Sequence, residues 1–310
     1  MAMGHRRCTA LLGALLAAVL ASCGGDEDGA PDRATPAGDP DKLVQESVAR
    51  NPVARSGRID GRIEIALKGV ARFAEPFSVG VAGPFEYRSG ASLPDYQLEL
   101  GARDLGVGLT SLRGRSWLSL GSTGYTLPGE VRRRLVRSAA PGHNGLTRTL
   151  SQFGVRPWRW ETDRRIAGRT RIDGVDVIHI TTSFTAGHIL RDANTLLELL
   201  SSLELTRATG LPDLISRRAR QIVVRSVTLK QGEQWIGVRD KVMRRSGFTM
   251  KFAISKADRA KLGGISAGTI VGELDVTGVG KPQRISAPAT TGSFADFQAG
   301  IDALGEAQGR

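Results

Sequence analysis

Apolar and polar residues alternate with a period of two through the first third of the chain. In residues 56–68, Ile59 and Ile63 fall on one face, and the charged residues Arg58 and Glu64 fall on the other. Successive side chains of a β-strand point to opposite sides of a sheet. The spacing therefore predicts a strand with one buried face.

The same alternation recurs in four further runs before residue 121. These runs cover residues 77–87, 96–100, 107–112 and 116–120, and short links containing glycine, proline or serine separate them. Consecutive strands joined by short links pair in an antiparallel manner. We therefore predict an antiparallel meander with one apolar face.

Helical periodicity replaces the alternation in the middle of the chain. Residues 129–138 and 145–153 are short helix candidates, and residues 185–205 form the longest one. In the longest candidate, Ile189 and Leu196 belong to an apolar stripe with a spacing of three and four residues,. Such a stripe must pack against another element.

Strands on both sides of this central group of helices indicate the fold class. The remaining predicted elements are helices at residues 41–50 and 212–220 and strands at residues 171–182, 221–229, 234–239, 248–254 and 269–279. The order favours an α+β fold, with a single large antiparallel sheet and helices gathered on one of its faces. No repeat of fixed period and no linker after residue 40 divides this body, so residues 41–289 are predicted to form one domain.

The start of the chain has the pattern of a secretory leader. A short basic segment precedes an apolar run that is too short for a stable membrane-spanning helix,. The run ends in Leu20-Ala21-Ser22-Cys23, which resembles the lipobox of bacterial lipoproteins. The resemblance implies that residues 1–22 are a signal peptide and that acyl chains on Cys23 hold the protein on the extracytoplasmic face of the cell membrane.

The composition changes immediately after this site. Residues 23–40 are rich in glycine, aspartate and proline and contain few apolar side chains. Such a segment cannot bury enough apolar area to order itself, so we predict a flexible tether.

Cysteine and metal chemistry is not expected in the body of the protein. The chain has two cysteines, Cys8 and Cys23, and both precede the predicted domain. This excludes an internal disulfide and a cysteine-based metal site there. His143, His179 and His188 share no metal-ligand spacing, so no cofactor is expected,.

The net charge has two interpretations. The chain carries 43 Lys and Arg against 31 Asp and Glu, a formal net charge of +12. The surplus indicates either binding to nucleic acid or anionic lipid, or scattered cations on solvated faces, which we prefer because the cations form no long run. An exported protein meets phospholipid and wall polymers instead of a genome, so no nucleic-acid partner is expected.

One catalytic pattern occurs in the sequence. Residues 264–268 fit G-x-S-x-G, the nucleophile elbow, with Ser266 as the serine. That motif requires a strand before it, a helix after it and a histidine later in the chain. Here a helix-like stretch precedes the motif, a strand follows, and the last histidine is His188. We therefore place Ser266 in a turn and expect no enzyme activity.

Two tryptophans bracket an arginine in the middle of the chain. Trp158-Arg159-Trp160 could stack on a sugar or a base, or it could pack on the sheet as a lid,. We favour the lid.

With these features together, the chain resembles the actinobacterial LppX/LprAFG-type lipoproteins, which in turn look like the carriers LolA and LolB. The segments that carry the likeness are residues 77–87, residues 172–180 with the helix that follows, residues 234–237 with Arg244 and Arg245, and residues 285–288. The resemblance implies a curved, half-closed antiparallel sheet whose concave side, covered by helices, forms an apolar cavity for acyl chains.

On this resemblance the apolar faces of the strands and of the longest helix would line the cavity. The implied lining residues are Phe77, Val79, Val81, Phe85, Leu98, Leu100, Ile189, Leu196, Leu200, Phe248, Met250 and Phe252.

Two functional hypotheses follow. The first is a monomeric, membrane-anchored lipoprotein that binds and transfers a lipid or glycolipid ligand in the cell envelope. The second is a structural or interaction lipoprotein whose sheet covers a filled core. Residues 290–310 have apolar side chains at helical spacing and form either a capping helix or a partner site.

Overall fold

The computed structural model describes residues 38–49, 53–71, 74–102, 105–138, 145–203, 205–206 and 213–307. The chain divides into two compact units, Met1–Ala34 and Thr35–Arg310, and every described residue belongs to the second unit. The predicted signal peptide, the predicted lipidation site Cys23 and nearly all of the predicted tether lie outside the described residues.

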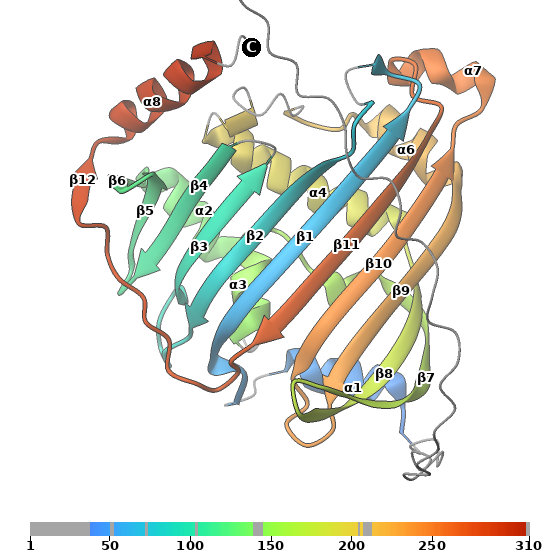
Figure 1. Ribbon diagram of the computed structural model, residues 1–310, viewed down its shortest axis with the longest axis horizontal. Helices are drawn as coiled ribbons and strands as arrows, with labels where there is room; N and C mark the ends of the chain where they lie inside the picture. Colours follow the sequence, from blue (N-terminus) through green and yellow to red (C-terminus); the bar gives the residue numbers. More distant parts are fainter. Residues whose placement is uncertain are drawn as a thin grey trace, which may run out of the picture. The chain divides into compact units, whose positions relative to one another are not determined.

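The described residues contain one sheet of twelve strands (Figure 1). In chain order the strands are β1 (Ser56–Lys68), β2 (Phe77–Glu86), β3 (Asp95–Ala102), β4 (Leu105–Leu112), β5 (Arg115–Leu120), β6 (Thr123–Thr126), β7 (Glu161–Ile172), β8 (Val175–Phe184), β9 (Val227–Gly237), β10 (Met243–Ala253), β11 (Ala267–Thr277) and β12 (Thr290–Gly292). Across the sheet their order is β12-β6-β5-β4-β3-β2-β1-β11-β10-β9-β8-β7.

The sheet consists of two meanders joined along one seam. Strands β1 to β6 pair with their neighbours in sequence, as do β7 to β11, and the long antiparallel pair of β1 with β11 unites the two meanders. All neighbours are antiparallel except β12, which pairs with β6 in a parallel manner. The open sheet with its two free edge strands confirms the predicted α+β class.

The helices lie mainly on one face of this sheet. They are α1 (Pro40–Val48), α2 (Gly129–Ser138), α3 (Gly145–Gln152), α4 (Ala186–Ser202), α6 (Arg217–Arg225), α7 (Lys256–Arg259) and α8 (Phe294–Ala307). Figure 1 shows α2, α3, α4 and α6 behind the sheet, α1 and α7 at opposite ends of its strands, and α8 beside the β5–β6 edge. We call the covered face concave and the other face convex.

The predicted strand at residues 171–182 is wrong in one respect, because these residues belong to a hairpin. Strands β7 and β8 flank Asp173 and Gly174, whose φ angles are 48° and 76°. Asp-Gly is a strong two-residue turn signal because both central residues of that turn need positive φ. Asp173 is therefore a turn residue and not a strand residue.

The predicted strand at residues 221–229 is also partly wrong. Residues 217–225 form the helix α6, and the strand begins at Val227. The side chain of Ser216 caps the helix by accepting a hydrogen bond from the Ala219 amide at 3.1 Å,. The β-branched residues Val223 and Val224 favour a strand locally, but burial of Ile222 on the sheet decides for the helix,.

Residues 290–310 include β12 and α8. Phe297 and Ile301 of α8 are 0% and 1% exposed and belong to the largest hydrophobic cluster. The ring of Phe297 lies 5.6 Å from that of Tyr125 in β6. The helix thus covers the β5–β6 edge, as a capping helix would.

Candidate functional site

The floor of a central cavity is built from two rows of facing residues on the concave side. One row runs across β3, β2, β1, β11 and β10 through Leu100, Val81, Gly61, Leu274 and Ser246, each opposite the next. Residues directly opposite in a sheet share one face. Since Val81 and Leu274 are apolar and half-buried, this row forms an apolar floor.

The second row lies next to the first. It consists of Val79, Ile63, Gly272 and Phe248 on β2, β1, β11 and β10. A Cβ atom at Gly272 would overlap the ring of Phe248, so the absence of a side chain at Gly272 lets this ring lie flat on the sheet. The ring of Phe248 also packs edge-on against Trp160, with 5.7 Å between centroids.

The roof of the cavity comes from α3, α4 and the segment between α3 and β7. Leu150 lies on the first helix and Phe153 directly follows it, and Leu196 and Leu200 lie on the second. Trp160 completes the roof, as the lid interpretation predicts.

Trp160 is fixed by a carboxylate of α4. Its indole Nε1 donates to Asp192 Oδ2 at 2.8 Å, and the backbone amide of Arg156 donates to the same oxygen at 2.9 Å. These two bonds tie the segment before β7 to α4, so the two parts of the roof are held together.

The space between floor and roof has a volume of about 150 Å³ and an almost wholly apolar wall. Arg62 and Glu273 are opposite each other on β1 and β11. Each is next in sequence to a residue of the cavity floor, Ile63 or Leu274, so their side chains point to the convex face,. Among the described residues that line the cavity, Ser246 alone places a polar side chain on the concave side. Since one water molecule takes up ~30 Å³ in the liquid, the space is equivalent to about five waters.

Six of the twelve predicted lining residues lie on the wall of this cavity. They are Val79, Val81, Leu100, Leu196, Leu200 and Phe248. They come from β2, β3, β10 and α4, and the tertiary structure brings them together.

The other six predicted residues do not line it. Phe85 and Leu98 are 1% and 0% exposed and lie in the largest hydrophobic cluster, under α3 and α8. Ile189 and Met250 belong to a separate cluster with Trp160 and Phe184. The two remaining residues, Phe77 and Phe252, lie at the α7 end of their strands; Phe252 packs against Ile222 of α6. Alternation identified the face of each strand correctly, but helices cover the strand ends, and only the middle of the face is left open.

Several lining residues were not predicted. They are Ile59, Ile63, Leu105, Val107, Leu150, Phe153, Val155, Pro157, Trp160, Leu205 and Leu274. Ile59, Ile63 and Val107 belong to predicted apolar strand faces, so the alternation itself could have found them, whereas Leu105 lies just before the predicted fourth strand. Val155, Pro157 and Trp160 lie in an irregular segment, where no periodicity marks a buried side.

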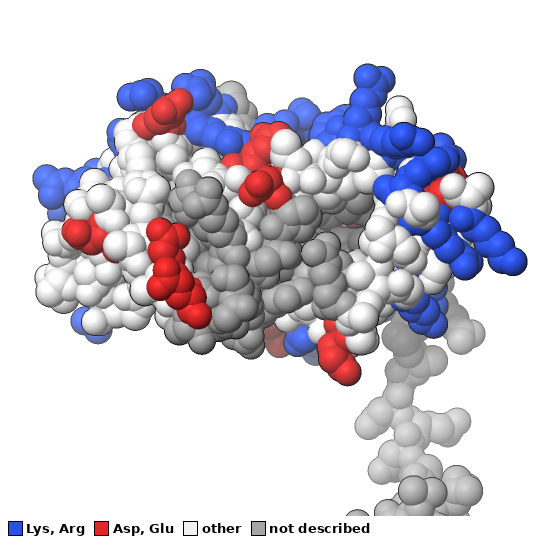
Figure 2. Space-filling view, turned by 90° about the horizontal axis from the view of Figure 1, so that it is seen from above, with Lys and Arg blue, Asp and Glu red and all other residues white. Residues whose placement is uncertain are grey.

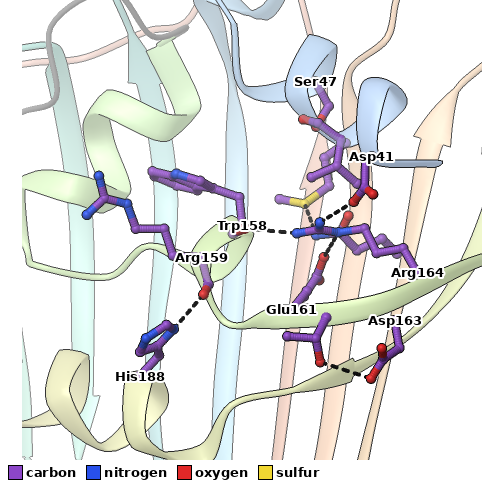
Figure 3. Close-up of polar contacts among 12 residues, drawn as sticks. Asp41, Ser47, Trp158, Arg159, Glu161, Asp163, Arg164 and His188 are labelled. Atoms are coloured by element: carbon purple, nitrogen blue, oxygen red, sulfur yellow. Dashed lines mark hydrogen bonds and ion pairs between the residues drawn. The ribbon is translucent and has the colours of Figure 1, made fainter. Parts of the chain in front are cut away.

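At the α1 end of the sheet, one arginine joins α1, β7 and the segment before β7 (Figure 3). Arg164 of β7 donates to Asp41 Oδ1 of α1 at 2.6 Å, to Glu161 Oε2 at 3.2 Å and to the carbonyl oxygen of Trp158 at 3.0 Å. Burial raises the pKa of Glu161 to about 7, and the Arg164 charge and hydrogen bond oppose that rise. This cluster fastens α1 to β7 and to the roof segment.

The residues with catalytic or metal-binding potential do not converge. Ser266 lies just before β11, and its hydroxyl donates to the Lys68 carbonyl oxygen at 3.2 Å. The Nδ1 atom of His188 is 2.7 Å from the Arg159 carbonyl oxygen, while His179 stacks on Trp235 on the convex face. Within the described part of the chain, no three His, Cys, Asp or Glu side chains form a group that could hold a metal ion.

In the part of the chain that the structure describes, no helix combines the length and the apolar character needed to cross a bilayer.

Known proteins match this chain by structure and not by sequence. No family model and no curated protein matches the sequence. Among solved structures, LprF from Mycobacterium bovis is 10% identical, with a TM-score of 0.36 over 80% of this chain and 96% of that chain. The Mycobacterium tuberculosis lipoprotein LppX is 12% identical, with a TM-score of 0.32 over 79% of this chain and 97% of that chain. A LolA superfamily protein from Nitrosomonas europaea is 9% identical, with a TM-score of 0.21 over 80% and 96%. The structural neighbours of this chain include LprF, LppX and a LolA superfamily protein.

Proposed function

We propose that this protein is a lipid-anchored protein of the bacterial cell envelope that binds a lipid or lipidated glycoconjugate and transfers it. The cavity on the concave side is the single observation that carries the proposal. It is roofed by α3, α4 and Trp160 and floored by β1, β2, β10 and β11.

The wall chemistry favours hydrocarbon over a polar ligand. An ordered water in a protein interior needs two to four polar partners, and a polar ligand group needs partners too. The concave wall offers the hydroxyl of Ser246 and otherwise aliphatic and aromatic side chains. Burial of an alkyl chain there gains ~25 cal/mol for each Å² removed from water.

The volume of the cavity limits how much of a lipid it can hold. Sites that bury a whole drug-sized ligand measure ~300–1,000 Å³. A space of about 150 Å³ suits part of a lipid, such as a short segment of one acyl chain. The headgroup would then lie outside the apolar wall.

The membrane anchor is the second element of the proposal. The Leu20-Ala21-Ser22-Cys23 sequence motivates it. We expect a fatty-acid analogue fed to the producing bacterium to label the wild type and not Cys23→Ala, and Cys23→Ala to leave the membrane fraction. An unlabelled wild type would refute the anchor without bearing on the cavity.

Enlarging a wall residue tests the cavity itself. Val79→Trp extends a side chain into the open space, so we expect co-purifying lipid seen by native mass spectrometry to fall. The melting temperature should change little, because filling a real void avoids the ~1–3 kcal/mol that overpacking costs in a filled core.

The matched control is Val271→Trp. Val271 is one position from Gly272 in β11 and lies on the convex face, so the same substitution is made on the opposite side of the sheet. Its lipid content should equal that of the wild type. Wild-type protein without lipid, together with a large loss of stability in Val79→Trp, would favour the structural alternative with a filled core.

A further inference from the structure

The α6–α7 end of the molecule carries a concentrated positive charge. We call the exposed side of α6 and of residues 256–262 the basic end. These two segments contain seven cations and one acid, which gives 7 − 1 = +6. Figure 2 views the molecule from above and shows Lys and Arg gathered on the side where Figure 1 places α7.

Most of this charge is not neutralised by other described residues. The single acid, Asp258, already accepts from Arg225 at 2.7 Å and from Lys261 at 2.6 Å. Arg217, Arg218 and Lys256 are exposed, and the described residues offer them no ion pair. Like charges this close repel one another, and an external anion relieves that repulsion.

Exposed apolar side chains accompany these cations. In the described part of the chain, the large apolar residues with the greatest exposure are Leu214 at 51% and Val224 at 41%, just before α6 and within it. Ile222 of the same helix is 1% exposed and packs against Phe252. A surface helix with cations beside outward apolar residues has the pattern of an interfacial membrane contact.

The concave wall leads toward the basic end. Ile65 of β1 is opposite Phe77 of β2 and Ile270 of β11, one row beyond Ile63 and Val79 of the cavity floor. All three are half-buried, and Leu67 follows on β1 and packs against the Ile222–Phe252 cluster. Apolar side chains therefore continue from the cavity toward α6 and α7.

Helix α8, beside the β5–β6 edge of the sheet, has the opposite charge. Residues 294–307, which form α8, contain three acids and no cation. An anionic surface would attract the basic end and repel α8.

We propose that the basic end is the surface on which the folded unit docks to an anionic phospholipid bilayer, with the apolar wall leading from the cavity toward the lipid. This inference deepens the proposed function and rests on it for the membrane location. Headgroup phosphates neutralise Arg217, Arg218 and Lys256, and Leu214 and Val224 enter the interfacial layer.

The test uses residues 35–310, which contain all the hydrophobic clusters and form one compact unit. This fragment should co-sediment with vesicles of phosphatidylcholine and phosphatidylglycerol and not with pure phosphatidylcholine, and binding should weaken with added salt. Arg217→Gln/Arg218→Gln/Lys256→Gln should lower the affinity at least tenfold, since each cation near an anionic surface contributes about fivefold.

The control replaces three other exposed cations at the opposite end of β1 and β11. Arg58→Gln/Lys281→Gln/Arg284→Gln has the same change in net charge and should keep vesicle affinity within about twofold. Equal losses in the two triple variants would overturn the proposal, because net charge alone would then explain binding. Binding of a short DNA duplex as tight as that of the vesicles, with the same loss in the first variant, would also overturn it in favour of a general polyanion site.

Failure of the proposed function is distinguishable from failure of this inference. Val79→Trp should lose co-purifying lipid and keep vesicle binding, whereas the first triple variant should keep co-purifying lipid and lose vesicle binding. If vesicle binding follows lipid content instead of charge, the docking surface is not the basic end.

Discussion

The middle of the concave face and its flank beneath α3 and α8 are built from the same kinds of residues but are packed differently. Leu98 and Leu100 lie on the same face of β3, two residues apart. Leu98 is 0% exposed and packs in the largest cluster, whereas Leu100 is half-buried and lines the cavity. Apolar composition does not distinguish an open site from a filled core; the elements above each residue do.

Removing these two side chains should give the largest difference in stability. Leu98→Ala leaves a new void in a filled cluster, so we expect a loss of ~2–5 kcal/mol in the free energy of unfolding. Leu100→Ala enlarges a space that already exists and should cost ~1 kcal/mol, because fewer contacts are lost. Urea denaturation monitored by tryptophan fluorescence measures both. Equal losses would indicate that the cavity is packed as tightly as the flank.

A smaller effect is expected from the glycines of the sheet. Gly272→Ala places a methyl group against the Phe248 ring and should cost ~1–3 kcal/mol by displacing it,. Gly101→Ala is the matched substitution, because no atom lies within 4 Å of a Cβ built there, and its effect should stay within about 0.5 kcal/mol,. Thermal unfolding of both variants tests whether Gly272 supports the cavity floor. A neutral Gly272→Ala would contradict the role that we give to Phe248.

The smallest effect concerns the Glu161–Arg164 cluster at the α1 end. The pKa of Glu161 is raised to about 7 in the folded protein, from 4.5. The stability that its neutral form contributes is therefore fully present below pH 4.5 and is lost as the pH rises through about 7. The side chain of Glu161→Gln stays neutral at every pH. The melting temperature of this variant should therefore rise relative to that of the wild type as the pH increases from 5 to 8.

The control for this prediction is Glu130→Gln on α2, where the carboxylate is exposed. Its melting temperature should follow that of the wild type at each pH. A Glu161→Gln variant that runs parallel to the wild type would show that Arg164 keeps the carboxylate charged throughout this range.

The local elements of this protein could be predicted from its sequence because their signals are local. The alternation of Ile59 and Ile63 against Arg58 and Glu64 defines β1 and its buried face, and α2 begins and ends where its periodicity does. The Asp173-Gly174 hairpin signal is local too, but the predicted strand at residues 171–182 ran through it and was wrong there. The α+β class follows from the order of these elements alone.

The tertiary structure alone decided where the concave face stays open. Pairing of β1 with β11 joins residues about 200 positions apart, and no periodicity encodes that register,. The position of Trp160 over Phe248 depends on its bond to Asp192 and on the missing side chain of Gly272. Sequence determines which face of each strand avoids water, because that depends on neighbours along the chain. Whether the space above it is filled depends on side-chain volumes contributed by distant segments, and those meet only in the folded protein.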